Sequence, residues 1–298
     1  MSPPARLLAS AVSALSLLAP TTSAPQQPVF KAKVEAIRVD VLVTQDRRPM
    51  RGLGRDDFEL FDNGVRQVVE VVEHFGDTEM VNPVRLPLNV VLALDTSDSV
   101  TGERLDQLCA ASYKMIDGLE KNDRAALVTF NDVLSLAVPL TNDFGRVRQS
   151  IRGMRPSGAT LLVDATYAGM VLPESDEGRN LLVLFTDGVD TGSFLRREAV
   201  IDTAKRTDVV VYAVAVAVPR RSSFLEDVTS QTGGRLFELD SVRDLPAVFA
   251  QILAEFRSRY VLSYSPRGVA PAGWHRIEVK VKNRRAAVKA RAGYLAGK

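Results

Sequence analysis

Oxygen-bearing side chains follow two apolar segments of the chain and end one glycine-containing loop. The first segment ends in Asp95, with Ser97 and Ser99 at the next alternating positions, and the second ends in a Thr-Asp-Gly sequence that contains Asp187. Between them, a Pro-Ser-Gly-Ala-Thr loop ends in Thr160 and opens a helical pattern. In open parallel sheets, ligand sites lie at the carboxyl ends of the strands. The pattern therefore predicts that these side chains meet at one edge of a sheet.

The five candidate ligands offer only oxygen atoms, from two carboxylates and three hydroxyls. Oxygen ligands favour a hard divalent cation, Mg²⁺ first, with Ca²⁺ or Mn²⁺ as alternatives, whereas zinc is expected with His or Cys. The carboxylates balance the charge of such an ion, and the neutral hydroxyls complete its shell without further negative charge. The ion then stays electrophilic toward a carboxylate from another molecule, which indicates a binding site.

Each part of the pattern also has an ordinary structural explanation, because Ser or Thr at the start of a helix usually caps it. Together and in this order, however, the residues resemble the metal-ion-dependent adhesion site (MIDAS) of the von Willebrand factor A family. That site combines Asp-x-Ser-x-Ser with a Thr in a second loop and an Asp in a third. All five positions are filled here, by Asp95, Ser97, Ser99, Thr160 and Asp187.

The resemblance implies a role for each residue. Asp95 and Asp187 would anchor the ion, directly or through water. The hydroxyls of Ser97, Ser99 and Thr160 would complete the shell, with Thr160 the residue expected to move between ligand states. The implied partner is a protein that offers an Asp or Glu carboxylate.

The resemblance covers residues 88–256, and the sequence ahead of them also looks like exported bacterial proteins that carry an A-type domain. One position departs from the family pattern: Asp98 stands where the first loop most often has Gly, and it adds a negative charge beside the site. Asp190, shortly after the third-loop Asp, is interpreted as a turn residue.

The elements around the candidate ligands alternate between two patterns. Continuous apolar runs, typical of strands buried on both faces, occur at 90–94, 125–130, 181–185 and 209–218. Apolar residues at helical spacing occur at 104–119, 161–172, 195–206, 224–231 and 245–256. Ser223 and Glu226 are interpreted as a capping box for the fourth of these helices. The alternation predicts an α/β fold, a doubly wound and mostly parallel sheet with helices on both faces.

Two-residue alternation, typical of half-buried strands, flanks this region on both sides. The N-terminal flank, 25–80, contains the hairpin turn signal Asp62-Asn63-Gly64 and is predicted to be a small β-rich module. Residues 77–87 are interpreted as a linker. The C-terminal segment, 257–298, returns to alternation, and we hypothesise that it packs with the N-terminal module.

The first residues have the layout of a secretory signal peptide, with Arg6 ahead of the apolar run 7–18 and a small polar stretch behind it. Residues 1–24 are therefore predicted to be a signal peptide, and the protein to be exported, periplasmic or secreted. The apolar run is shorter than a spanning helix requires, so no membrane span is expected. The single cysteine, Cys109, lies at helical spacing among apolar residues and is predicted to be a buried structural thiol.

Other functions have weaker support in the sequence. The formal net charge of +2 indicates no global attraction to nucleic acid or anionic membranes. The basic residues of the C-terminal segment alternate with apolar ones, which is typical of a solvated strand face; they are Lys280, Lys282, Arg284, Arg285, Lys289 and Arg291.

An enzyme is also disfavoured. The sequence has no Gly-x-x-x-x-Gly-Lys loop and no Gly-x-Ser-x-Gly elbow. Its two histidines, His74 and His275, lie in the strand-like flanks and are predicted to be surface or packing residues. Two alternatives to metal-dependent binding stay open: a structural envelope scaffold with an unoccupied metal site and, with less support, a Mg²⁺-dependent enzyme.

Overall fold

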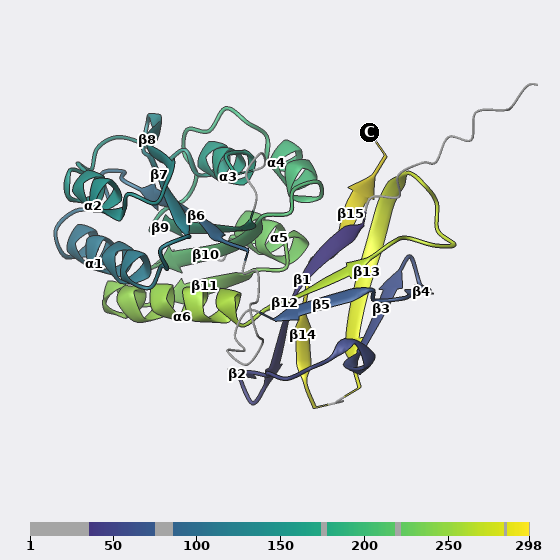
Figure 1. The fold of residues 1–298 in the computed structure, drawn as a ribbon. Helices are drawn as coiled ribbons and strands as arrows, with labels where there is room; N and C mark the ends of the chain where they lie inside the picture. Colours follow the sequence, from purple (N-terminus) through teal and green to yellow (C-terminus); the bar gives the residue numbers. More distant parts are fainter. Residues whose placement is uncertain (1–35, 75–85, 174–177, 218–221, 283–284, 298) are drawn as a thin grey trace, which may run out of the picture. The chain divides into compact units, whose positions relative to one another are not determined.

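The candidate ligands lie in a region built around one six-stranded sheet (Figure 1). The computed structural model describes residues 36–74, 86–173, 178–217, 222–282 and 285–297, so the predicted signal peptide and most of the predicted linker lie outside the described residues. The strands of this sheet are β6 (Leu88–Asp95), β7 (Arg124–Phe130), β8 (Leu134–Thr141), β9 (Arg179–Thr186), β10 (Val210–Val216) and β11 (Arg235–Leu239).

The spatial order of the strands is β11-β10-β9-β6-β7-β8. All neighbours are parallel except β7 and β8, which are antiparallel. Strands β6, β9 and β10 are buried along their whole length. Their sequences are therefore apolar at nearly every position instead of alternating.

Helices cover both faces of this sheet (Figure 1). They are α1 (Glu103–Asp117), α2 (Phe144–Arg152), α3 (Leu162–Val171), α4 (Arg197–Ala204), α5 (Ser223–Gln231) and α6 (Leu245–Arg257). Successive residues of a strand point to opposite faces. Leu92 of β6 accordingly packs with residues of α1, α2 and α6, while the adjacent Val91 packs with residues of α3, α4 and α5. The predicted doubly wound α/β fold is confirmed.

The prediction that Ser223 caps α5 is wrong. The helix begins at Ser223, and its N-cap is Ser222, whose side chain accepts a hydrogen bond from the backbone N–H of Leu225 at 3.4 Å. Ser222 has the extended backbone that an N-cap requires, whereas Ser223 is already the first helical residue.

The flanking segments form two antiparallel sheets. Their strands are β1 (Ile37–Gln45), β2 (Arg48–Pro49), β3 (Phe58–Asp62), β4 (Val65–Gln67), β5 (Val71–His74), β12 (Tyr260–Tyr264), β13 (Gly273–Val281), β14 (Ala287–Lys289) and β15 (Gly293–Ala296). One sheet has the order β14-β1-β12-β5, with β2 paired to β1, and the other has the order β15-β13-β3-β4. Asn63 and Gly64 both have positive φ between β3 and β4, as a tight hairpin turn requires.

Strands that precede the six-stranded sheet in the sequence thus pair with strands that follow it. β1 pairs with β12 and β3 pairs with β13. Leu60, Tyr260 and Leu262 contribute to one apolar core within them. We call these described strands, β1 to β5 and β12 to β15, the β module.

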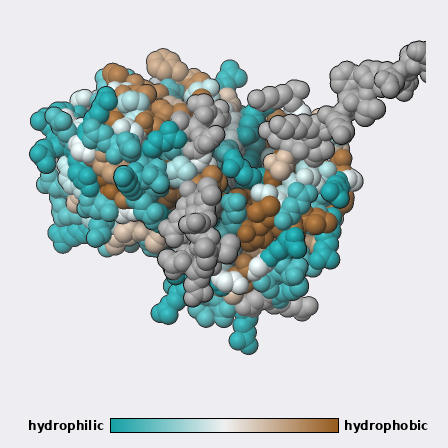
Figure 2. All heavy atoms as spheres, viewed as in Figure 1, coloured by the Kyte–Doolittle hydropathy of each residue, from teal (hydrophilic) through white to brown (hydrophobic). Residues whose placement is uncertain are grey.

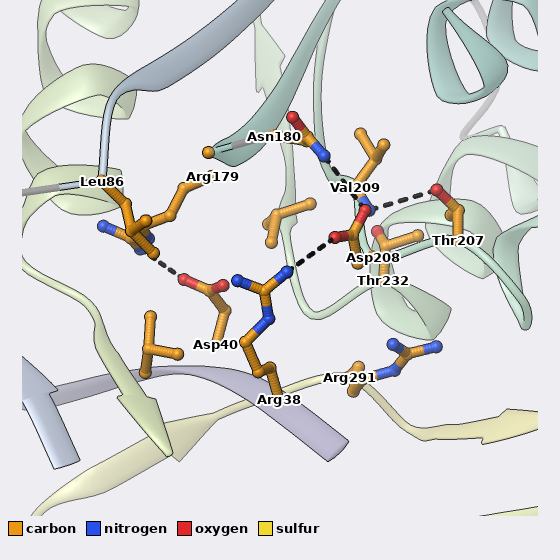
Figure 3. Close-up of a pocket in the computed structure, with 13 residues that line it drawn as sticks. Arg38, Asp40, Leu86, Arg179, Asn180, Thr207, Asp208, Val209, Thr232 and Arg291 are labelled. Atoms are coloured by element: carbon orange, nitrogen blue, oxygen red, sulfur yellow. Dashed lines mark hydrogen bonds and ion pairs between the residues drawn. The ribbon is translucent and has the colours of Figure 1, made fainter. Parts of the chain in front are cut away.

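Ion pairs join β1 to residues at the amino ends of the parallel strands (Figure 3). The buried Arg179 guanidinium contacts the carboxylate of Asp40, and Arg38 lies 3.9 Å from Asp208. These contacts lie at the strand ends opposite to the candidate ligands. No helix in the part of the chain that the structure describes is long and apolar enough to cross a membrane.

Candidate metal centre

Two adjacent parallel strands position the candidate carboxylates. Asp95 is the last residue of β6, and Asp187 follows the last residue of β9. Leu94 of β6 is in register with Phe185 of β9, so the two strands end side by side. Both Asp residues are buried.

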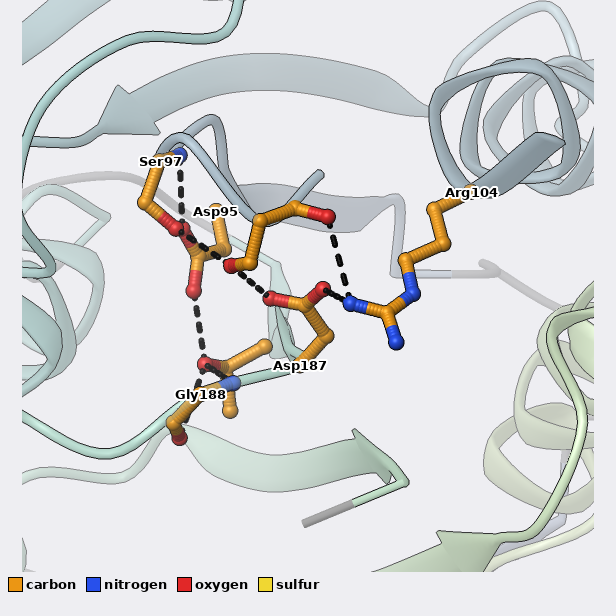
Figure 4. A network of polar contacts seen from close by, with 7 residues as sticks. Asp95, Ser97, Arg104, Asp187 and Gly188 are labelled. Carbon is orange, nitrogen blue, oxygen red and sulfur yellow. Dashed lines mark hydrogen bonds and ion pairs between the residues drawn. The ribbon is translucent and has the colours of Figure 1, made fainter. Parts of the chain in front are cut away.

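A chain of hydrogen bonds connects four of the predicted residues (Figure 4). The backbone N–H of Ser97 donates to Oδ1 of Asp95 at 2.9 Å. The hydroxyls of Ser97 and Ser99 lie 3.1 Å apart, and Ser99 Oγ donates to Oδ1 of Asp187 at 2.6 Å. The structure therefore brings the first-loop hydroxyls between the two carboxylates.

Thr160 lies beside this chain without belonging to it in the described contacts. Its Oγ1 is 3.6 Å from the position that a Cβ would take on Gly188, directly after Asp187. Its backbone N–H donates to Thr191 Oγ1 at 3.0 Å, and its carbonyl accepts from the N–H of Thr191 at 3.0 Å. The second loop is thus hydrogen-bonded to the third, and the hydroxyl of Thr160 lies near the start of the third loop.

Backbone hydrogen bonds also fix the second loop to the first. The N–H of Ser157 donates to the carbonyl of Thr96 at 2.8 Å, and the N–H of Asp98 donates to the carbonyl of Gly158 at 3.2 Å. The side chain of Asp98 is exposed, so its charge lies at the surface near the site. All three loops are therefore connected through their backbones.

Arg104 is a charged residue of the site that sequence reasoning missed. Its guanidinium donates to Oδ2 of Asp187 at 2.6 Å and to the carbonyl of Ser99 at 3.2 Å. Arg104 lies in the first turn of α1, where a cation is disfavoured by the positive end of the helix dipole. That unfavourable placement was the available signal, and the nearby carboxylate explains it.

Thr186 is a second residue of the site that sequence reasoning missed. Its hydroxyl donates to Oδ2 of Asp95 at 2.7 Å and accepts from the N–H of Gly188 at 3.1 Å. Asp95 therefore has a hydrogen-bond donor on each carboxylate oxygen. These bonds hold its side chain in one orientation.

Burial raises the pKa of Asp95 above its ordinary value, and the charge of the nearby Asp187 acts in the same direction. Hydrogen bonds from Ser97 and Thr186 oppose this rise without cancelling it. A raised pKa means that the negative charge of Asp95 is not fully compensated by its surroundings. A cation next to Asp95 would supply the missing compensation.

The donor set fits a hard divalent cation. The described residues contain no group of three or more His, Cys, Asp or Glu side chains with metal-site geometry. The site instead combines two carboxylates with hydroxyls, and all of these atoms are oxygens, as Mg²⁺ and Ca²⁺ prefer. The residues present could therefore hold such an ion.

Asp190 is more than a turn residue. Its carboxylate accepts hydrogen bonds from the N–H of Val163, at 3.2 Å, and from the hydroxyl of Ser193. It therefore connects the third loop to the first turn of α3.

The other singled-out residues lie away from the centre. His275 is buried in the β module, with Nδ1 2.7 Å from Oδ1 of Asp62, and His74 stacks on Tyr260. Cys109 is half-buried against the core, and burial, with a smaller effect of Asp106, raises the pKa of its thiol.

The fold and the site together define a class of protein: a doubly wound α/β domain with oxygen ligands at the carboxyl edge of its sheet. The family profile of the von Willebrand factor type A domain matches residues 89–251, more than half of the chain. The chain belongs to this family.

Curated relatives are distant. Inter-alpha-trypsin inhibitor heavy chain H1 of Sus scrofa is 24% identical over 215 residues, which is 65% of this chain and 24% of the relative. An uncharacterized protein of Synechocystis, sll0103, is 24% identical over 178 residues, 56% of this chain and 41% of the relative. The chain thus spans less than half the length of these relatives.

Solved structures show the same fold. A von Willebrand factor type A protein from Catenulispora acidiphila has a TM-score of 0.52 at 10% identity, covering 90% of this chain and 74% of its own. Proximal thread matrix protein 1 from the mussel byssus was solved with a zinc-occupied MIDAS motif. It has a TM-score of 0.52 at 18% identity, and the match covers 61% of this chain and 48% of the mussel chain.

Proposed function

We propose that this protein is exported and binds a protein partner through a divalent cation, with Mg²⁺ as the first candidate and Ca²⁺ or Mn²⁺ as alternatives. The observation that carries the proposal is the hydrogen-bonded chain from Asp95 through Ser97 and Ser99 to Asp187. It gathers oxygen ligands from two loops at the carboxyl ends of adjacent parallel strands, with Thr160 beside them.

Each residue has a distinct part in this function. Asp95 supplies the buried negative charge, and its two hydrogen-bond donors orient it. Ser97, Ser99 and Thr160 supply hydroxyl oxygens. Both oxygens of Asp187 are engaged, by Ser99 and by Arg104, so Asp187 acts by orienting the serine and by its charge. When bound, the cation supplies a Lewis acid for an Asp or Glu carboxylate of the partner.

One observation favours a second candidate, a structural scaffold that works without metal. Arg104 already compensates the charge of Asp187. The site would then hold its loops together through its own hydrogen bonds. Catalysis is not proposed, because hydroxyls are poor acid-base groups and both histidines lie in the β module.

Calorimetry separates the two candidates. The protein is titrated with Mg²⁺, Ca²⁺, Mn²⁺ and Zn²⁺, the last because the mussel protein holds zinc in this motif. We expect saturable Mg²⁺ binding that is lost in Asp95→Ala and kept in Asp98→Ala, which removes a nearby exposed carboxylate. Equal binding by wild type and Asp95→Ala would contradict the metal function and favour the scaffold.

The partner and the export are tested in cells. Crosslinking from the native envelope, with and without EDTA, should capture a protein only when divalent cations are present. Export predicts that the mature N-terminus, sequenced from the fractionated protein, lies near residue 24. Recovery of the unprocessed chain in the cytosol would contradict export.

A further inference from the structure

Three apolar side chains are exposed on the loop that follows Asp187. Val189 is 52% exposed, Phe194 is 89% exposed and Leu195 is 39% exposed. We call residues 189–195 the apolar loop. Single exposed apolar residues are ordinary, and Figure 2 shows several small apolar areas on a mainly hydrophilic face. Three of them in one short loop beside a candidate binding site need a separate explanation.

Hydrogen bonds to a buried carboxylate hold the apolar loop in place. Asp164, in the first turn of α3, accepts from the backbone N–H of Phe194 at 3.0 Å and from that of Leu195 at 2.9 Å. The hydroxyl of Ser193 accepts from the N–H of Val163 at 3.1 Å. These hydrogen bonds fix the backbone at Phe194, whose side chain points largely into solvent.

The same loop is bonded directly to a predicted metal ligand. Thr191 exchanges hydrogen bonds with Thr160, and Gly192 donates to the carbonyl of Thr160 at 3.2 Å. Phe194 is three positions after Thr191, a reach of at most about 11 Å along the chain. Phe194 is therefore within reach of a partner segment that places a carboxylate at the metal centre.

Further apolar side chains and charged side chains are exposed next to the apolar loop. Tyr167 and Val171 of α3 are exposed, three and seven residues after Asp164, so they lie on the same helix face as that carboxylate. Directly after the loop, Arg196, Arg197 and Glu198 are exposed, two cations and one anion. The neighbourhood therefore offers apolar area next to an excess of one positive charge, which is complementary to an acidic and apolar partner.

We propose that the apolar loop is a specificity surface for the partner's neighbouring residues. The occupant is an extended protein segment in which a large apolar side chain lies within about three residues of the Asp or Glu that reaches the metal centre, since an extended chain covers about 3.3 Å per residue. The proposal rests on the metal-dependent binding proposed above. The acid at the metal centre is one half of the recognised motif, and the apolar side chain at the apolar loop is the other half.

Peptide selection tests both halves separately. Phage that display random peptides are bound to the full-length protein in Mg²⁺ and eluted with EDTA, in parallel on wild type, Phe194→Ser and Asp95→Ala. We expect peptides with an acid and a nearby Phe, Leu, Ile or Met on wild type. Phe194→Ser should enrich the acid without the apolar residue, and Asp95→Ala should enrich neither.

Two results would overturn the inference in different ways. If wild type enriches an acid with no apolar neighbour, the apolar loop has no part in recognition and the metal function stands. If EDTA elutes no enriched peptide from wild type, the metal function fails and the inference fails with it.

A titration gives the size of the effect. One enriched peptide is synthesised with a fluorophore, and its affinity is measured by anisotropy. Phe194→Ser should weaken binding about tenfold or more, as expected for loss of one buried aromatic contact. Val68→Ser, which removes another exposed apolar residue, between β4 and β5, should leave the affinity unchanged. Unchanged affinity in Phe194→Ser, with Mg²⁺ binding and thermal unfolding as in wild type, would overturn the proposal.

Discussion

Arg104 sets the charge of the metal centre at the scale of one side chain. Two buried carboxylates face each other across the hydroxyls of Ser97 and Ser99, and the guanidinium compensates one of them. A cation bound beside Asp95 would be repelled by the positive charge of Arg104. If the proposed cation binds there, we expect the arginine to lower the affinity for it and to stabilise the site in its absence.

Replacing Arg104 by Gln should accordingly strengthen Mg²⁺ binding by about fivefold. A unit charge at about 4 Å contributes on the order of 4 kcal/mol at an effective dielectric constant near 20, and the partial exposure of Arg104 reduces this to about 1 kcal/mol. Calorimetry measures the change, with Arg66→Gln in the β module as the matched control. Weaker binding in Arg104→Gln would show that the arginine supports the metal site.

Thr186 gives a stability prediction at the same scale. Thr186→Val keeps the shape of the side chain and removes the hydroxyl that donates to Asp95. We expect the free energy of unfolding in metal-free buffer to fall by about 1–3 kcal/mol, because a buried carboxylate loses a hydrogen bond. Urea denaturation measures it. An unchanged midpoint would mean that water replaces the hydroxyl.

The residue types and their spacing pointed to the candidate ligands because each lies at a strand end or a helix start. Asp95, Ser97, Ser99 and Asp187 do meet in the structure. Arg104 could not be predicted from spacing, since its contact with Asp187 joins the start of α1 to the loop after β9, and these are distant in sequence.

At the scale of elements, the loops of the site are fixed to the first turn of α3. Asp164 accepts two backbone hydrogen bonds from the apolar loop, and Asp190 accepts one from Val163. The helix start and the third loop are therefore joined into one hydrogen-bonded unit. Any movement of Thr160 between ligand states would be transmitted to Phe194.

Asp164→Ala should release this unit. We expect faster amide hydrogen exchange at Phe194 and Leu195, and a fall of about 1–3 kcal/mol in the free energy of unfolding, because two buried-carboxylate hydrogen bonds are lost. Hydrogen-exchange mass spectrometry measures the first effect. Asp227→Ala, at an exposed carboxylate of α5, is the control. Unchanged exchange in Asp164→Ala would show that the loop is held by other contacts.

Element prediction succeeded where burial was uniform. The continuous apolar runs of β6, β9 and β10 identified the parallel sheet, because strands covered on both faces need apolar residues throughout. Strand β8 was missed, since it is an antiparallel edge strand with mostly exposed side chains. The mainly polar α2 was missed for a related reason, as only Val147 and Ile151 are buried along it.

At the scale of the whole molecule, one buried tyrosine of the main core makes the free energy of unfolding depend on pH in the alkaline range. Burial raises the pKa of Tyr212 from 10.0 to about 12. The native state therefore keeps a proton that the unfolded chain loses above about pH 10. Stability is fully present below that pH, and it falls by about 1.4 kcal/mol per pH unit as the pH rises toward 12.

Urea denaturation between neutral pH and pH 11 measures this loss. The Tyr212→Phe variant should lose less stability than wild type above about pH 10, since its side chain cannot ionise. Both proteins should show the same pH dependence at neutral pH. Identical alkaline profiles would show that other groups cause the loss.

The β module gives a further prediction, because β1 and β5 pair with β12, and β3 pairs with β13. A protease site placed in the predicted linker, 77–87, should yield two fragments that stay together in native gel filtration and separate only in denaturant. Release of the N-terminal fragment under native conditions would contradict the pairing.

The neighbouring strands β5 and β12 also have a mechanical consequence. One precedes the six-stranded sheet in the sequence and the other follows it, and they are hydrogen-bonded side by side. Tension between a partner at the metal centre and the β module would be shared by two covalent tethers acting in parallel. The domain would be pulled from both of its ends at once and would resist unravelling from either one.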